Sequence, residues 1–137
     1  MGVDVRRARG GVPCLRGLKM LVAEDQAMIA LDLVTTLRGF GCVVLPAAPS
    51  NTKALAVIRA ERPDAALLDV SLVDGSAAPV AEALTAAGVP FAVLTGHDQR
   101  AIGEPALRAA PFLAKPYAHE ALRATVTRLA ATVAASR

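Results

Sequence analysis

The chain has 137 residues, of which 54% are hydrophobic and only 3% aromatic, and its formal net charge is +3. That length favours one domain with a real core, and the composition makes the core aliphatic and rich in alanine. The modest charge does not require a nucleic acid partner, no apolar stretch reaches the roughly 18 residues of a membrane span, and no apolar segment follows the N-terminal arginines as in a signal peptide. We therefore expect a soluble, cytoplasmic protein with no membrane or nucleic acid partner.

Residues 1–17 differ in composition from the rest of the chain. They hold glycines, a proline and scattered arginines without apolar periodicity, which predicts a flexible N-terminal arm ahead of a domain at 18–137. Cys14 lies in this arm and Cys42 lies beside a predicted strand, with no spacing typical of metal ligands. Two unrelated thiols fit a reducing cytoplasm better than a disulfide scaffold.

The first half of the domain alternates short apolar runs with helical periodicity. The runs at 19–23 and 65–68 predict buried strands, and the run at 43–45 predicts a further strand between them. Ser50 or Asn51 can cap the helix between the second and third strands. The expected inward positions are Ala30, Leu33, Val34 and Leu37 in the first helix, and Leu55 and Ile58 in the second.

The second half continues this alternation, with one segment in which the helical signal is weak. Residues 70–76 form a loop with an Asp-Gly turn pair, and strands are expected at 91–94 and 112–114. Residues 99–111 are broken by a glycine and two prolines, which predicts a weak or short fourth helix. The expected inward positions are Val80, Ala83, Leu84 and Ala87 in the third helix, and Leu122, Val126, Leu129 and Val133 in the last.

Polar residues stand at the ends of four of these five apolar runs. They are Glu24 and Asp25, then Asp69, then Thr95 with Gly96, then Lys115 with Pro116. Alternating strands and helices predict a parallel five-stranded sheet with helices on both faces, and ligands of such sheets bind at the carboxyl ends of the strands. Three carboxylates in one small site repel each other and need a cation, and Mg²⁺ suits oxygen ligands best. These residues therefore predict a site for Mg²⁺ and a phosphoryl group.

In this pattern the chain resembles the response-regulator receiver domains, from about residue 18 to 136. The resemblance implies a flavodoxin-like, doubly wound sheet of order 2-1-3-4-5, and it makes Asp69 the phosphoacceptor. It also implies that Asp25 and Asp69 bind Mg²⁺ directly, that Glu24 acts mainly through water, and that the backbone carbonyl of Ser71 completes the protein ligands.

Further roles are implied for the residues around this centre. Thr95, Lys115 and the Gly96 amide would contact the phosphoryl oxygens, and the Lys115–Pro116 peptide would be cis. Thr95 and Phe112 would form the switch, although Phe112 is equally well an ordinary core residue of its strand. Tyr117 is ambiguous in the same way. His97 and Asp98 look like a catalytic pair, but without a nucleophile nearby they fit a loop at the rim of the site.

Residues 90–97 are similar to the PFxFATGY pattern of the FATGUY receiver subgroup, with Leu94 in place of Ala and His97 in place of Tyr. Members of that subgroup are often single-domain and pair with HWE-type sensor kinases. The expected function is therefore to accept a phosphoryl group from a sensor histidine kinase or phosphotransfer protein, and to signal by protein contact or act as a phosphate sink. Since no sequence follows the last helix, no separate catalytic or DNA-binding domain is expected.

Four alternative functions or folds compete with this one. A pseudo-receiver that no longer takes phosphate would have a broken acidic pocket, and this one is intact in sequence. The chain also fits a receiver piece of a larger hybrid kinase. A haloacid-dehalogenase-like phosphatase needs a second aspartate where Ser71 stands. A nucleotide-binding fold needs a glycine-rich loop after the first strand, and residues 23–26 contain no glycine.

Overall fold

The computed structural model describes residues 15–96 and 103–135. Five parallel strands form one sheet in the order β2-β1-β3-β6-β7, and two further short strands form an antiparallel hairpin. The strands are β1 (Lys19–Ala23), β2 (Val43–Val44), β3 (Ala65–Asp69), β4 (Ser71–Leu72), β5 (Gly75–Ser76), β6 (Phe91–Thr95) and β7 (Phe112–Ala114). The helices are α1 (Ala27–Gly39), α2 (Asn51–Glu61), α3 (Ala78–Ala86), α4 (Pro105–Arg108) and α5 (His119–Ala135). The predicted five-stranded order is confirmed, because β4 and β5 stand outside the main sheet.

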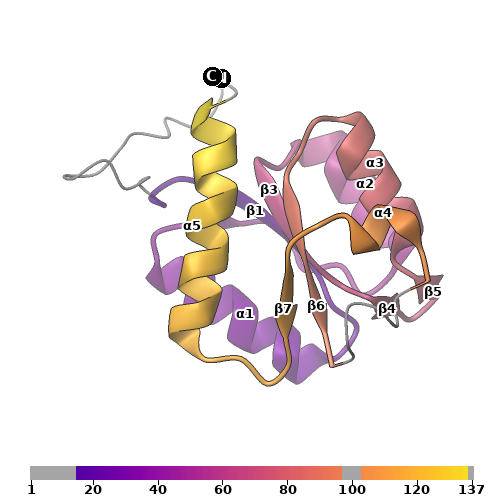
Figure 1. Ribbon diagram of the computed structural model, residues 1–137, viewed down its shortest axis with the longest axis horizontal. Coiled ribbons are helices and arrows are strands. Elements are labelled where there is room, and N and C mark those ends of the chain that lie inside the picture. The colour runs from indigo at the N-terminus through magenta and orange to yellow at the C-terminus, as the bar shows by residue number, and fades with distance from the viewer. Residues whose placement is uncertain (1–14, 97–102, 136–137) are drawn as a thin grey trace.

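Helices cover both faces of the sheet, as Figure 1 shows: α1 and α5 on one side, and α2, α3 and α4 on the other. The side chains of β1 alternate between these layers, since Leu21 packs with α2 and α3 while Met20 and Val22 pack with α1 and α5. Strands buried on both faces must be apolar at every position, not at every second one. That requirement explains the unbroken apolar runs of the three central strands β1, β3 and β6, whereas the edge strands β2 and β7 are partly exposed.

The apolar faces of the long helices were predicted with uneven success. All four inward positions of α5 are buried, and in α1 three of four are, with Val34 only partly so. In α2 the buried positions are Asn51, Ala54 and Val57, whereas the predicted Leu55 and Ile58 are half-buried. In α3, Ala83 is half-buried and Ala87 is exposed beyond the helix end. Alanine fits either face of a helix, so the apolar periodicity in these alanine-rich segments does not define one direction.

The fourth helix is as short as the sequence predicts. It spans four residues, with Pro105 in its first turn and Leu107 as its buried anchor. The expected rim residues His97 and Asp98 lie outside the described residues, as does the stretch up to residue 102.

At the N-terminal side, packing against the domain begins earlier than the expected boundary at residue 18. Leu15 is buried, and the Gly17 amide donates to the Gly41 carbonyl at 2.8 Å. Residues 1–14, including Cys14, lie outside the described part of the chain. None of the helices in the described ranges combines the length and hydropathy that crossing a bilayer requires.

Candidate functional site

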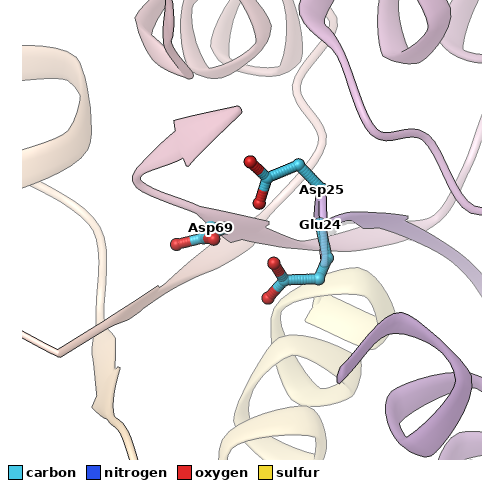
Figure 2. Close-up of side chains that lie close together, drawn as sticks. All are labelled: Glu24, Asp25 and Asp69. Carbon is cyan, nitrogen blue, oxygen red and sulfur yellow. The ribbon is translucent and has the colours of Figure 1, made fainter. Parts of the chain in front are cut away.

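Three carboxylates converge at the carboxyl ends of β1 and β3. The parallel register pairs Ala23 with Leu68, so Glu24 and Asp25 leave β1 beside the end of β3, where Asp69 lies. One oxygen from each carboxylate lies within 4.8 Å of the others. Figure 2 shows the three side chains grouped around a common space. The structure thus brings together the acidic residues that the sequence predicted would meet.

Glu24 is the most enclosed of the three. It keeps only 2% of its surface exposed, and both of its carboxylate oxygens accept hydrogen bonds. Oε1 accepts from Lys115 Nζ at 2.9 Å, and Oε2 accepts from the Gln26 backbone N–H at 3.1 Å. The Glu24 backbone is held as well, because its N–H donates to the Ala48 carbonyl at 2.9 Å. A buried carboxylate satisfied in this way is a fixed part of the site.

Lys115 reaches the cluster from the end of β7. Its backbone N–H donates to the Thr95 carbonyl at 2.8 Å, and the peptide to Pro116 is cis, as the resemblance implied. Its Nζ lies 2.9 Å from Glu24 Oε1 and 3.4 Å from Asp69 Oδ2. Burial alone lowers the pKa of Lys115, but the hydrogen bond to Glu24 and the negative charges of Asp69 and Glu24 outweigh it and raise the pKa above its usual value. The lysine is therefore a fixed cation that bridges two carboxylates.

The charges within the cluster do not balance. Glu24, Asp25 and Asp69 carry three formal negative charges, and Lys115 supplies one positive charge. Asp25 is exposed and Asp69 is partly exposed, so both can be reached from solvent. An oxygen-only donor set with excess negative charge, open on one side, fits a hard divalent cation such as Mg²⁺.

Of the other predicted site residues, Thr95, Gly96 and Ser71 lie at or just beyond the carboxyl ends of β6 and β3, whereas Phe112 begins β7. Thr95 ends β6 and is 1% exposed, and Gly96 follows it at the surface. Ser71 lies two residues beyond Asp69 in β4 and is exposed. Phe112 lies on β7 with 40% of its surface exposed, so the interpretation of this ring as a core residue is wrong.

Tyr117 borders the site and is neutral. Burial first, and then the negative charges of Asp32 and Glu24, raise its pKa to about 12. The phenol therefore keeps its proton across the physiological range.

The contacts around Asp74 are not predicted by the sequence, in which this residue is only half of an Asp-Gly turn pair. The Asp74 carboxylate accepts hydrogen bonds from the Asn51 and Thr52 backbone N–H groups at the start of α2, at 2.8 and 3.3 Å. The Asn51 backbone N–H foremost lowers the pKa of Asp74 below its usual value. The only signal in the sequence was the pair Ser50-Asn51, either of which can cap a helix. Ser50 is the cap, since its Oγ accepts from the Lys53 backbone N–H at 3.0 Å, and Asn51 is buried.

The sequence comparisons agree with this geometry. A family model described as the response regulator receiver domain matches residues 20–127. The chain belongs to this family. The receiver is 30% identical over 102 residues to the phyllosphere-induced regulator PhyR of Methylorubrum extorquens, a match that covers 72% of this chain and 38% of the relative.

Two solved structures extend the comparison to the fold. The crystal structure of the response regulator PhyR from Brucella abortus is 25% identical with a TM-score of 0.76, over 88% of this receiver and 50% of that chain. The solution structure of SdrG from Sphingomonas melonis is 31% identical with a TM-score of 0.71, over 82% of this receiver and 96% of that chain. The receiver therefore spans half or less of these two PhyR proteins but nearly all of SdrG.

Proposed function

We propose that this receiver accepts a phosphoryl group on Asp69 in a Mg²⁺-dependent reaction. The observation that carries the proposal is the setting of Asp69: one of its oxygens lies 3.4 Å from Lys115 Nζ, and the carboxylate groups with Glu24 and Asp25 within 4.8 Å. In a pseudo-receiver that binds no cation, the repulsion among three carboxylates in one small space would cost free energy that nothing offsets.

The phosphoryl donor is a phosphohistidine of a sensor histidine kinase or phosphotransfer protein. An Asp69 oxygen forms a bond to phosphorus while the bond between the donor nitrogen and phosphorus breaks. The imidazole leaves with that electron pair and takes up a proton. Attack of water on the phosphorus later releases inorganic phosphate and restores the Asp69 carboxylate, so the domain acts as a phosphoacceptor and not as a separate enzyme.

The residues around Asp69 have distinct tasks in this reaction. Asp25, Asp69 and the Ser71 carbonyl would hold the cation directly and Glu24 through water. Mg²⁺, when bound, supplies positive charge next to the phosphoryl oxygens. Lys115 is already within reach of Asp69 and offers a second positive charge to those oxygens. The Thr95 hydroxyl and the Gly96 amide complete the set of donors, and Phe112 responds to the inward movement of Thr95.

The signal then passes by contact with a partner protein, or the receiver competes for kinase phosphate as a sink. The names of its relatives describe regulators, which supports a role in signalling. We place this exchange in the cytoplasm, where a free, buried thiol such as Cys42 stays reduced.

The test is metal-dependent labelling followed by intact mass. The protein is incubated with acetyl phosphate or a phosphorylated kinase, in Mg²⁺ or in EDTA. The wild type should gain one phosphoryl group only in Mg²⁺, and Asp69→Asn should gain none. Asp32→Asn, which changes an exposed aspartate on α1, is the matched control and should label like the wild type. Full labelling of Asp69→Asn, or equal labelling in EDTA, would refute the proposal.

A further inference from the structure

We infer that Asp74 is a positioning residue for the cation site: it fastens the β4–β5 hairpin to the start of α2 and thereby fixes the backbone of Ser71. The inference rests on the proposed function, in which the Ser71 carbonyl is a cation ligand. Asp74 is not one of the residues that would hold the cation or the phosphoryl group, so its effect would pass through the hairpin.

Asp74 binds the first two residues of α2 with both carboxylate oxygens. Oδ1 accepts from the Asn51 backbone N–H at 2.8 Å and from Asn51 Nδ2 at 3.1 Å. Oδ2 accepts from the Thr52 backbone N–H at 3.3 Å and from Thr52 Oγ1 at 3.4 Å. The N–H groups of a first helical turn have no partner within the helix, and a carboxylate is their strongest natural acceptor. Asp74 thus holds two segments together that are more than 20 residues apart in the chain.

The hairpin depends on such outside contacts. Each of its strands has two residues, with Ser71 opposite Ser76 and Leu72 opposite Gly75. Two-stranded ribbons of this size are not stable alone. Leu72 is buried, but Val73 at the turn is 72% exposed and adds little burial. Polar contacts with the start of α2 therefore carry much of what holds the hairpin in place.

Further hydrogen bonds carry this constraint back to Ser71. The Val73 N–H donates to the Pro49 carbonyl at 3.0 Å, and the Ala77 N–H donates to the Val70 carbonyl at 2.8 Å. Asn51 Nδ2 donates to the Ser76 carbonyl at 2.8 Å. Val70 and Val73, on either side of Ser71, are therefore each held by a backbone hydrogen bond. Asp74 acts on Ser71 through Asn51, which binds both the Asp74 carboxylate and Ser76, the residue opposite Ser71 in the hairpin.

The contact between Asn51 and the hairpin leaves one buried polar atom of Asn51 unsatisfied. It is 7% exposed, and its Oδ1 accepts no hydrogen bond from the residues that the structure describes. Turning the amide over would place that oxygen against Asp74 Oδ1 and the Ser76 carbonyl, which are both acceptors. The side chain therefore keeps an unsatisfied buried oxygen in order to donate twice to the hairpin.

The same segment of chain also holds the other side of the acidic pocket. Ala48, three residues before Asn51, accepts from the Glu24 N–H and donates to the Val22 carbonyl, both at 2.9 Å. Residues 48–52 thus span from the end of β1 to the hairpin. Loss of the Asp74 hydrogen bonds should free the side of the pocket that holds Ser71 and leave the contacts that hold Glu24 in place.

A purely structural role for Asp74 as a cap of α2 is the competing explanation, and the chain offers a matched control. Ser50 caps the same helix through its own side chain, and no hydrogen bond recorded among the described residues joins that side chain to the hairpin. Ser50→Ala weakens the start of α2 without releasing Ser71. Asp74→Ala does both, and Asp74→Asn keeps one acceptor oxygen and should fall between them.

The experiment measures the Mg²⁺ concentration that half-saturates acetyl phosphate labelling, together with amide hydrogen exchange of residues 71–77. Asp74→Ala should raise the half-saturating concentration about 10-fold, the lower end of the range for groups that orient a metal ligand. Labelling should still reach the wild-type maximum at saturating Mg²⁺. Exchange at the Val73 amide should speed up in Asp74→Ala, and Ser50→Ala should change neither quantity.

Equal shifts in Asp74→Ala and Ser50→Ala would overturn the inference in favour of simple capping. Faster exchange with an unchanged Mg²⁺ requirement would overturn it too, because the hairpin would then not govern the cation. A wild type that takes no label even in saturating Mg²⁺ is a different failure, since it removes the proposed function and with it the site that Asp74 positions.

Discussion

Replacing Lys115 with methionine tests whether this lysine balances the charge of the acidic cluster. Its Nζ lies 2.9 Å from Glu24 Oε1 and 3.4 Å from Asp69 Oδ2. At an effective dielectric of about 20, these separations correspond to gross attractions of about 6 and about 5 kcal/mol. Desolvation of the three groups offsets most of that sum.

The net loss follows from what the substitution leaves behind. Glu24 would stay buried with one hydrogen bond, from the Gln26 amide. Removing one partner of a buried ion pair costs about 3–5 kcal/mol, and the lower end applies because the Lys115 side chain keeps 20% of its surface in water. A loss of about 3 kcal/mol lowers the melting temperature by about 10 °C for a domain of this size.

The assay is thermal unfolding followed by circular dichroism, in EDTA and over a Mg²⁺ titration. Lys53→Met, the same change at an exposed lysine of α2, is the control and should melt close to the wild type. Without Lys115 the pocket keeps all three negative charges, so Mg²⁺ should stabilise Lys115→Met more than the wild type. If Lys115→Met has the same melting temperature as Lys53→Met in EDTA, Lys115 is not the counter-ion of the cluster. The same conclusion follows if Mg²⁺ raises the melting temperature of Lys115→Met less than that of the wild type.

Three more outcomes follow from the same structure. Mg²⁺ should raise the melting temperature of the wild type but not of Asp25→Ala, and an equal rise in both would remove Asp25 from the cation site. Burial raises the pKa of Cys42 to about 11, so in a Cys14→Ser background iodoacetamide at pH 8 should react only as the protein unfolds, and rapid alkylation of the folded protein would contradict this. The free energy of unfolding should also fall as the pH rises from 9 towards 11, because the unfolded thiol loses its proton at a lower pH than the folded one. Residues 103–111 should exchange amide hydrogens faster than α3 and slow when beryllofluoride is added with Mg²⁺, whereas protection equal to α3 and no response would place the switch elsewhere.

The sequence predicted the sheet and the meeting of the acidic side chains because both depend on local signals. Strands buried on both faces are apolar throughout, so the first polar residue marks where each strand ends. Glu24, Asp25 and Asp69 lie at those positions. Parallel pairing then forces the ends to one edge of the sheet. No knowledge of individual side-chain contacts was needed for that conclusion.

What the sequence did not reveal depends on contacts between distant segments. The β4–β5 hairpin has strands of two residues, too short for an alternating pattern to show. Asp74 and Asn51 are 23 residues apart, and nothing local distinguishes a turn aspartate from one that binds the start of another helix. In the same way, we expected Lys115 to contact the phosphoryl oxygens, whereas the nearest partner of its ammonium group is Glu24, 91 residues away in the chain.

The most direct test of the central claim is the chemical location of the phosphoryl group. Borohydride reduces an aspartyl phosphate to homoserine, which peptide mass spectrometry locates in the chain. After phosphorylation in Mg²⁺ and reduction, we expect homoserine at position 69 and an unchanged residue at position 25. A reduced residue at any other position, or no reduced residue in a protein that carries the label, would contradict the assignment of Asp69 as the phosphoacceptor.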